Sequence, residues 1–358
     1  MKKRSPLRKT LKILLCVLLA LVAAAGAYIA YVFIDYHRLP DNQALTAEGS
    51  QTEPARAATA YTLVSFNTGF GAYEPDYSFF MDGGKYSWAF SLDRLLKNME
   101  NIGQFLREQN ADFYFLQEVD ENATRTYHLN ERALLSDALT GYDRVWAENW
   151  DSPFLFYPFT QPHGKTLCGI MTFSRFDIVN ALRRSLPIEN TVMKLVDLDR
   201  CYSVSRVPVE NGRELVLYNV HLSAYTSDGT IANDQLKMLL ADMAAEYEKG
   251  NYTVCGGDFN KDLLGDSSQY FGISGADYTW AQPIPAGMFD GLPLTLAAAS
   301  NAASCRVAEA PYNPQQFVLT LDGFIVSDNV TVISKQTLDT GFAYSDHNPV
   351  QLRFLLDP

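Results

Sequence analysis

The sequence lacks the short motifs that identify several common classes of enzyme and binding protein. Its five cysteines form no CxxC pair and no cysteine–histidine cluster of the zinc-binding type. It contains no Walker A loop, no HExxH motif and no serine nucleophile elbow. These absences argue against a zinc module, a P-loop nucleotidase, an HExxH metalloprotease and an elbow-type serine hydrolase. The sequence also has no internal repeat of the solenoid type.

The cysteines are widely spaced, and their spacing does not define a disulfide. Cys16 lies in the apolar N-terminal run. Cys255 is expected to be a small buried hydrophobe at the end of a strand. A disulfide among Cys168, Cys201 and Cys305 stays open, because an oxidising compartment would permit one.

Positive charge is scarce outside the N-terminus. The first twelve residues carry six lysines and arginines and no acid, whereas the rest of the chain carries 23 Lys+Arg against 41 Asp+Glu, a net charge of −18. Such a surface repels polyanions at long range, so bulk nucleic-acid binding is disfavoured. A local basic patch remains compatible with this charge.

Residues 13–34 form an uncharged apolar run behind this basic tail (residues 1–12). As a helix the run spans about 33 Å, enough for a hydrocarbon core of roughly 30 Å. The positive-inside rule then predicts a single-pass anchor in the cell membrane, with the N-terminus in the cytoplasm and the remaining chain outside. The small residues Ala23–Ala27 keep a cleaved signal peptide open as the alternative. Residues 35–58 lack periodicity and are expected to be a linker, followed by one domain over 59–358.

Apolar content of 47% and aromatic content of 13% fit a globular α/β or β-rich domain. Helical periodicity predicts one helix that begins after Ser91 and a second over 230–249. Strand candidates outnumber helices, which indicates layered packing with sheets in the middle. The expected strands are 61–66, 112–116, 168–174, 202–207, 215–220, 252–255, 317–326 and 350–354.

The stretch 252–260 (Tyr-Thr-Val-Cys-Gly-Gly-Asp-Phe-Asn) is the most informative in the chain. Asp258 and Asn260 follow a β-branched run and two glycines, and residues two apart in an extended chain face the same side. Five other strand candidates end in, or are preceded by, the same kinds of polar residue. Because strand ends in layered α/β folds form one rim, these side chains are expected to converge there. They are Asn67, Glu118, Asn219 with His221, Asp322, and Asp346 with His347.

Carboxylate and carboxamide oxygens without thiolates suit a hard divalent cation, Mg²⁺ with Mn²⁺ as an alternative. Two histidines suit proton transfer or phosphate binding near neutral pH. Water activated by the metal ion is therefore the expected attacking group.

At these residues the sequence resembles the endonuclease/exonuclease/phosphatase superfamily. The matching motifs occur in the family's order over roughly residues 60–356. They are Asn67, Gln117-Glu118, Asn219-x-His221, Gly257-Asp258-Phe-Asn260, Leu321-Asp322-Gly-Phe and Ser345-Asp346-His347.

The resemblance implies an α/β fold, a four-layer sandwich with two central mixed β-sheets flanked by helices. It also implies a metal-dependent phosphoesterase whose residues have distinct roles. The metal ligands would be Glu118, Asn67 and Asp346. The catalytic residues would be Asp258 on the attacking water, His347 oriented by Asp322, and His221. The phosphate-binding residues would be Asn260, Asn219 and, as a weaker candidate from the residues alone, Arg306.

Each of these residues also has a structural explanation when taken singly, as a turn residue or a satisfied core histidine. The six motifs together make that explanation improbable. Arg125 and Lys165 are weaker candidates for phosphate contact, with surface solvation as the alternative. His37, His128 and His163 lie outside the motifs and are interpreted as structural.

Two aromatic segments bear on the substrate, 70–90 and 146–159. Packing in the core is the simpler interpretation, but exposed aromatics there would form an apolar rim. Such a rim on an anchored protein favours a lipid-type or small phosphodiester over nucleic acid. An extracellular nuclease, and a non-catalytic module that binds a phosphorylated ligand, remain the alternatives.

Overall fold

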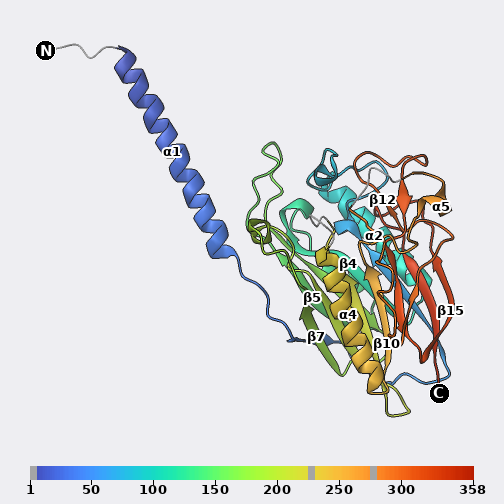
Figure 1. Ribbon diagram of the computed structural model, residues 1–358. Coiled ribbons are helices and arrows are strands. Elements are labelled where there is room, and N and C mark those ends of the chain that lie inside the picture. Colours follow the sequence, from blue (N-terminus) through green and yellow to red (C-terminus); the bar gives the residue numbers. More distant parts are fainter. Residues whose placement is uncertain (1–5, 225–229, 275–279) are drawn as a thin grey trace.

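The computed structural model describes residues 6–224, 230–274 and 280–358, and two seven-stranded β-sheets form its centre (Figure 1). The first sheet runs in the order β1 (Gln43–Leu45), β7 (Asn180–Ser185), β8 (Cys201–Pro208), β9 (Glu214–His221), β10 (Tyr252–Asp258), β14 (Asp322–Ser327) and β11 (Leu294–Ala297). The second runs β15 (Val330–Thr337), β16 (Val350–Leu356), β3 (Ala60–Asn67), β4 (Phe113–Ala123), β6 (Thr166–Ser174), β5 (Asp143–Asp151) and β2 (Ala47–Glu48). A short ladder pairs β12 (Cys305–Arg306) with β13 (Val318–Leu319).

Each sheet contains one parallel pair of strands, and a helix connects the members of each pair. In the second sheet β3 and β4 are parallel and α2 (Leu92–Gln109) joins them. In the first sheet β9 and β10 are parallel and α4 (Thr230–Glu248) joins them. A crossover of this kind returns the chain to the same edge of the sheet. The carboxyl ends of all four strands therefore point toward one rim of the molecule.

Helices cover the outer faces of the sheets. The helix α2 begins at Ser91, whose hydroxyl accepts a hydrogen bond from Arg94 N at 3.3 Å, and it buries Leu95, Met99 and Ile102 against the second sheet. The helix α4 packs on the first sheet. Together they give the predicted four-layer sandwich of mixed sheets. The smaller helices are α3 (Glu131–Ala138), α5 (Ser268–Phe271) and four 3₁₀ turns at Gly69–Gly71, Phe80–Asp82, Thr124–Thr126 and Val192–Leu195.

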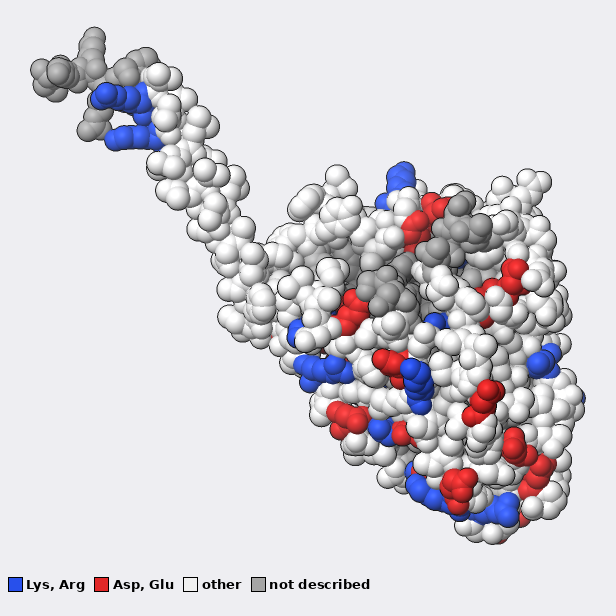
Figure 2. All heavy atoms as spheres, in the orientation of Figure 1, with Lys and Arg blue, Asp and Glu red and all other residues white. Residues whose placement is uncertain are grey.

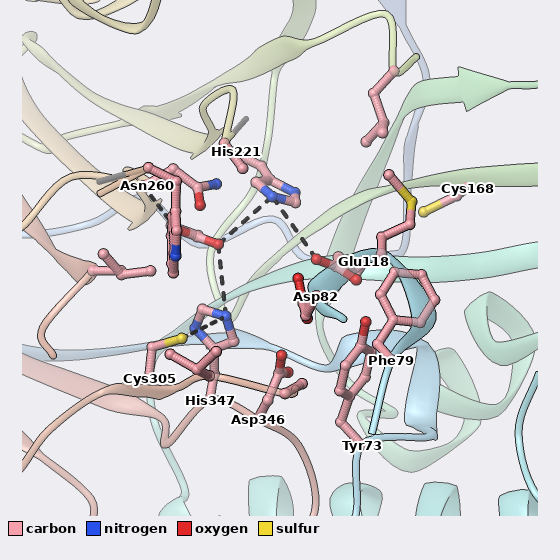
Figure 3. Close-up of a pocket in the computed structure, with 18 of the residues that line it drawn as sticks. Tyr73, Phe79, Asp82, Glu118, Cys168, His221, Asn260, Cys305, Asp346 and His347 are labelled. Carbon is pink, nitrogen blue, oxygen red and sulfur yellow. Dashed lines mark hydrogen bonds and ion pairs between the residues drawn. The ribbon is translucent and has the colours of Figure 1, made fainter. Parts of the chain in front are cut away.

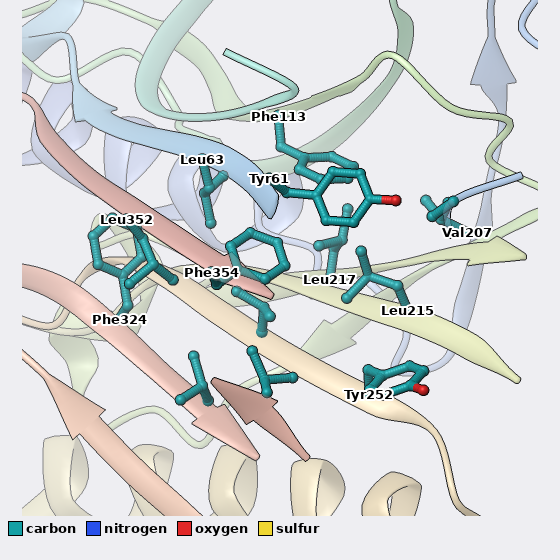
Figure 4. Packing of buried hydrophobic residues seen from close by; sticks show 14 of the residues in the cluster. Tyr61, Leu63, Phe113, Val207, Leu215, Leu217, Tyr252, Phe324, Leu352 and Phe354 are labelled. Carbon is teal, nitrogen blue, oxygen red and sulfur yellow. The ribbon is translucent and has the colours of Figure 1, made fainter. Parts of the chain in front are cut away.

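The main core lies between the two sheets (Figure 4). Tyr61, Phe113 and Phe354 from the second sheet meet Leu217 and Tyr252 from the first, and all five are at most 2% exposed. Burying one such aromatic side chain stabilises the fold by roughly 1.5–3 kcal/mol. This interface fixes the distance between the sheets, and with it the spacing of the side chains at the rim.

The helix α1 (Pro6–Asp35) projects from the domain (Figure 1). Its segment Leu7–Asp35 is long and apolar enough to cross a membrane. The C-terminal end of α1 contacts the domain, because Tyr28 Oη donates to Phe154 O at 2.9 Å and Phe154 N donates to Tyr31 Oη at 3.0 Å.

Three local expectations need correction. The segment 35–58 is not a free linker, because β1 and β2 add an edge strand to each sheet, and Ala55 is fully buried. These strands have only three and two residues, too few to show a period of two. The expected strand 317–326 is divided between β13 and β14, so Asp322 begins a strand instead of ending one. Glu118 lies within β4, where the register shifts between Leu116 and Val119.

Candidate active site

The rim of the sandwich contains a pocket to which both sheets contribute (Figure 3). In the first sheet Asp258, at the end of β10, is in register with His221 on β9 and with Asp322 on β14. Because β14 is antiparallel to β10, the first residue of β14 lies beside the last residue of β10. Strand order thus places an imidazole and two carboxylates in one row.

Asn67 and Glu118 belong to the second sheet and meet this row. Asn67 Nδ2 donates to Glu118 Oε1 and to Asp258 Oδ2, each at 3.1 Å. Glu118 has a φ of +53°, a left-handed backbone conformation that non-glycine residues adopt at a cost of about 1–3 kcal/mol. The bulge in β4 aims this carboxylate into the pocket. Asn67 Oδ1 accepts from Gly69 N at 3.0 Å, so its nitrogen, not its oxygen, faces the carboxylates.

His347 and Asp322 form a buried hydrogen-bonded pair. His347 Nδ1 lies 2.7 Å from Asp322 Oδ2, which also accepts from Ser304 Oγ at 2.7 Å. Burial acts to lower the pKa of His347, but the charge and hydrogen bond of Asp322 together with Cys305 outweigh burial and hold that pKa well above its ordinary value. His347 therefore carries a positive charge at neutral pH.

His221 is in the opposite protonation state. Burial lowers its pKa well below the ordinary value, and the positive charges of Arg200 and His347 lower it further. His221 Nε2 is 3.6 Å from Asp258 Oδ2, and His347 Nε2 is 3.8 Å from the same oxygen. Figure 3 shows the two rings on either side of the site. One neutral and one charged imidazole thus lie beside the same carboxylate. Such a difference in pKa allows one group to act as an acid and another as a base.

Asp258 and Asn260 complete the centre of the pocket. Burial raises the pKa of Asp258 to about 7; His347 opposes this rise and Asp322 adds to it. Asp258 Oδ1 accepts from Asn260 N at 2.8 Å, and Asn260 Nδ2 donates to Leu222 O at 2.8 Å. These bonds hold the Asn260 amide at the pocket wall, where its φ is +48°.

Two of the expected phosphate-binding residues have structural roles. Asn219 is fully buried and does not line the pocket; it accepts from Gln117 Nε2 at 2.7 Å and donates to Met171 O at 2.8 Å. Its amide links the two sheets, so we assign it no phosphate contact. Arg306 lines the pocket, but its Nη2 donates to the carbonyls of Tyr73 and Glu74, each at 3.2 Å. Its side chain holds that loop in place.

The weaker candidates are also structural. Arg125 makes two hydrogen bonds to Asp120 at 2.8 and 2.9 Å and stacks on Phe70. Lys165 pairs with Asp151 and Asp35 beside the end of α1.

The donor chemistry of the site fits a divalent cation. Glu118 and Asp346 line the same pocket wall, and burial raises the pKa of Asp346, with Glu118 adding to the rise. Because the charge of Glu118 raises the pKa of Asp346, a cation between these two carboxylates would be favourable. Asp258, Asp322 and His347 also cluster closely enough to hold an ion. His347 is protonated there and already bonded to Asp322 through Nδ1, and an imidazolium offers no lone pair to an ion, so Glu118 and Asp346 are the better candidates.

Sequence reasoning missed several residues that line the pocket. His163 was interpreted as structural, yet it lines the pocket; burial lowers its pKa to about 3. Cys305 Sγ lies 3.6 Å from His347 Nε2, and burial raises the pKa of that thiol to about 12. Arg200 lines the pocket directly before β8. None of these residues belongs to a motif, so only the tertiary structure shows that they line the pocket. All described cysteines are free thiols.

The aromatic segments are divided between core and surface. Phe70, Tyr73, Tyr77 and Phe79 of the first segment are buried, as the simpler interpretation predicted. In the second segment the loop 154–159 exposes three aromatic side chains. They are Phe156 (49% exposed), Tyr157 (64%) and Phe159 (84%).

Comparison with known proteins agrees with this geometry. The sequence profile described as "Endonuclease/Exonuclease/phosphatase family" matches residues 64–347, and the chain belongs to that family. A search of the curated proteins finds no match.

Solved structures show the same fold at low identity. An endonuclease/exonuclease/phosphatase from Beutenbergia cavernae is 17% identical with a TM-score of 0.61, over 83% of this chain and 72% of that chain. ANGEL2, a 2′,3′-cyclic phosphatase, is 15% identical with a TM-score of 0.54, over 90% and 100%. A Bacteroides vulgatus member of the family is 16% identical with a TM-score of 0.52, over 84% and 100%.

Proposed function

We propose that this protein is a membrane-anchored, divalent-metal-dependent phosphoesterase that hydrolyses a phosphodiester. The observation that carries the proposal is the meeting of Glu118, Asp258 and His347 in one pocket, although the sequence separates them by up to 229 residues. Family members include phosphatases and nucleases by name, which supports hydrolysis of a phosphoester.

The protonation states suggest how the residues divide the work. A water molecule attacks phosphorus; Asp258, whose pKa is about 7, accepts its proton. The charged His347, held by Asp322, faces the developing negative charge on the phosphoryl oxygens. The neutral His221 and Asn260 would position those oxygens by hydrogen bonds. The P–O bond to the alcohol breaks, and the alkoxide leaves with a proton from solvent or from His347.

Glu118 and Asp346 would hold the cation, Mg²⁺ or Mn²⁺, with the Asn67 side chain beside them. When bound, a divalent cation supplies charge stabilisation for the phosphoryl group. In the present orientation Asn67 bridges Glu118 and Asp258 as a donor, so its role as a ligand requires rotation of its amide.

The surface near the pocket supports a lipid-type or small phosphodiester. Tyr28 of α1 packs on Phe156 with ring centroids 5.0 Å apart, and Tyr157 packs on Phe80 at 5.8 Å. Met81, next in the chain, is 59% exposed and lines the pocket. A series of apolar contacts thus leads from the end of the expected membrane span to the site. An interfacial position for these aromatics follows if α1 crosses the bilayer.

The charge balance of residues 13–358, 23 Lys+Arg against 41 Asp+Glu, gives little support to the nuclease alternative. Figure 2 shows α1 uncharged along its length with basic residues at its N-terminal end, and the visible face of the domain carries both signs in small groups. Phosphate backbones are bound by continuous basic surfaces. We therefore place nucleic acid second.

The test is a substrate panel with the full-length chain in nanodiscs. The substrates are a phospholipid-type diester, bis(p-nitrophenyl) phosphate, single-stranded and duplex DNA, and inositol phosphates, each with Mg²⁺, Mn²⁺ or EDTA. We expect metal-dependent turnover of a diester that Asp258→Ala and His347→Ala abolish. Preferential cleavage of DNA would favour the nuclease. Absence of turnover on every substrate would favour a non-catalytic module that binds a phosphorylated ligand.

A surface variant separates the role of the apolar loop from that of catalysis. Tyr157→Ser with Phe159→Ser should reduce lipid turnover about tenfold or more and leave bis(p-nitrophenyl) phosphate unchanged. Ile333→Ser, on β15 and 47% exposed, is the matched control and should change neither. If the loop variant keeps wild-type turnover of the lipid as well as of bis(p-nitrophenyl) phosphate, the case for a membrane-bound substrate is removed. Signal-peptide cleavage would appear as a mature chain that begins near residue 28, which would remove the anchor.

A further inference from the structure

One arginine in the pocket wall stands apart from the other buried arginines. Four arginines of the described residues are buried, at 0–7% exposure: Arg125, Arg183, Arg200 and Arg306. Arg183, for example, donates to Glu148 O, Ser185 Oγ and Asp199 O at 2.6–2.7 Å. Arg306 also leaves Nε without a partner, but its Nη2 donates to two carbonyls. By contrast, Nε and Nη1 of Arg200 are both buried without a hydrogen-bond partner, and no carboxylate of the described residues forms an ion pair with Arg200.

The carboxylates nearest to Arg200 in the chain make their contacts with other groups, and neither forms an ion pair with Arg200. Asp199 Oδ2 accepts from Leu39 N at 2.7 Å and lies 3.5 Å from Arg183 Nη2. Asp197 Oδ1 accepts from Leu198 N at 2.7 Å. A buried guanidinium without a partner is costly, because it has lost its hydration and gained no anion in return. Native proteins pair such a group, so a missing partner points to a ligand.

The position of Arg200 identifies the missing partner as an anion in the pocket. Arg200 lines the pocket together with His221 and Asp258, and its charge contributes to the lowered pKa of His221. The carboxylates of the pocket attract a cation, whereas Arg200 places a fixed positive charge at the same cavity. Guanidinium groups bind phosphate oxygens through two parallel hydrogen bonds, a geometry that lysine cannot offer.

We propose that Arg200 is the principal protein cation for the substrate phosphoryl group, which it binds from the wall that carries His221. This inference rests on the proposed function for the identity of the substrate. The binding of a tetrahedral oxyanion by Arg200 can be tested without any turnover. In this arrangement Arg200 takes the phosphate-binding role that the sequence suggested for Arg306.

The experiment compares the full-length wild-type chain with Arg200→Met in detergent, with Mg²⁺ present. Without phosphate, Arg200→Met should unfold a few degrees higher than wild type, because methionine fills the space without an unpaired charge. Titration with inorganic phosphate should raise the Tm of wild type, and its apparent Kd should be about 10–100-fold weaker in Arg200→Met, the loss expected for a charged hydrogen-bonded pair.

Two further variants make the result decisive. Arg183→Met, which breaks three satisfied hydrogen bonds, should lower Tm without changing the phosphate Kd. Arg200→Lys keeps the charge and should recover only part of the phosphate affinity, and it serves in place of Arg200→Met if that variant does not fold.

A structural role for Arg200 predicts the opposite pattern. An unchanged phosphate Kd in Arg200→Met, an Arg200→Lys affinity equal to wild type, or a loss of Tm as large as that of Arg183→Met would overturn the inference. Substrate turnover is then measured separately. Weakened phosphate binding in Arg200→Met with no turnover by wild type would keep the anion site and reject the phosphoesterase. Turnover by wild type, together with an unchanged phosphate Kd in Arg200→Met, would keep the phosphoesterase and reject Arg200 as the anion site.

Discussion

Replacement of Asp322 by asparagine tests the hydrogen-bonded pair at the centre of the site. Asp322→Asn keeps the size of the side chain and removes its charge. In the wild type this charge is the largest of the effects that oppose burial and raise the pKa of His347. The asparagine amide can donate to His347 Nδ1, which then becomes an acceptor, so the imidazolium changes to a neutral ring.

The magnitude follows from the 2.7 Å contact. A hydrogen bond between charged groups contributes about 1.5–3 kcal/mol, and a positioned proton donor contributes about 10²–10⁴-fold to rate. We expect kcat of Asp322→Asn to fall by about 10²–10⁴ while KM changes less than about threefold, because the pair acts on developing charge and not on substrate binding.

The assay uses the full-length chain in detergent with Mg²⁺ and the best diester of the substrate panel. Asp328→Asn, at an exposed position just after β14, is the matched control and should keep wild-type kcat. Thermal unfolding of both variants verifies the fold. A kcat of Asp322→Asn within about threefold of wild type would refute the assignment of a charged His347 to catalysis.

Three other expectations concern the metal and the stability of the fold. EDTA should reduce turnover to background and added Mg²⁺ should restore it; activity insensitive to EDTA contradicts the cation site. Gly257→Ala should unfold the domain or lower its stability by more than about 3 kcal/mol, because a Cβ there would lie 1.9 Å from Val220 O. Gly212→Ala, which also has a positive φ (+82°) but open space around it, should cost only about 1 kcal/mol in urea unfolding. Burial acts to raise the pKa of Glu246, but hydrogen bonds led by Arg206 lower it to about 2, so its stabilisation is complete above the ordinary value of 4.5 and lost as pH falls toward 2. Between pH 4.5 and 2, Glu246→Gln should therefore lose less unfolding free energy than wild type. Equal losses in the two proteins would contradict a stabilising Glu246–Arg206 interaction.

The glycines before Asp258 illustrate where sequence reasoning reaches its limit. Two glycines suggested a turn and a close approach at this point. The structure confirms a close approach, but the nearby groups are neighbouring strands and not a ligand. A Cβ on Gly257 would meet Val220 O of β9, and a Cβ on Gly256 would meet Phe324 and Phe115. A sequence shows that space is needed and does not show what fills it.

Asn219 and Arg200 show the same limit for the site. Asn219 belongs to a motif but faces the interior, where it links the sheets through Gln117. Arg200 belongs to no motif and follows a loop, yet it lies in the pocket wall, and its Nε and Nη1 have no hydrogen-bond partner among the described residues. Side-chain direction at a strand end depends on local bulges and on the packing of the other sheet, and neither leaves a local signature in the sequence.

The amino-acid sequence alone determined the layered α/β class, the apolar N-terminal helix and the residue types of the site. These properties follow from periodicity, composition and the chemistry of short motifs, which are local. Only the tertiary structure decided that Glu118 projects from a bulge, that Asp322 begins its strand beside Asp258, and that the two histidines differ in charge. Those properties depend on distances and burial between residues far apart in the chain, which are set by how the two sheets pack.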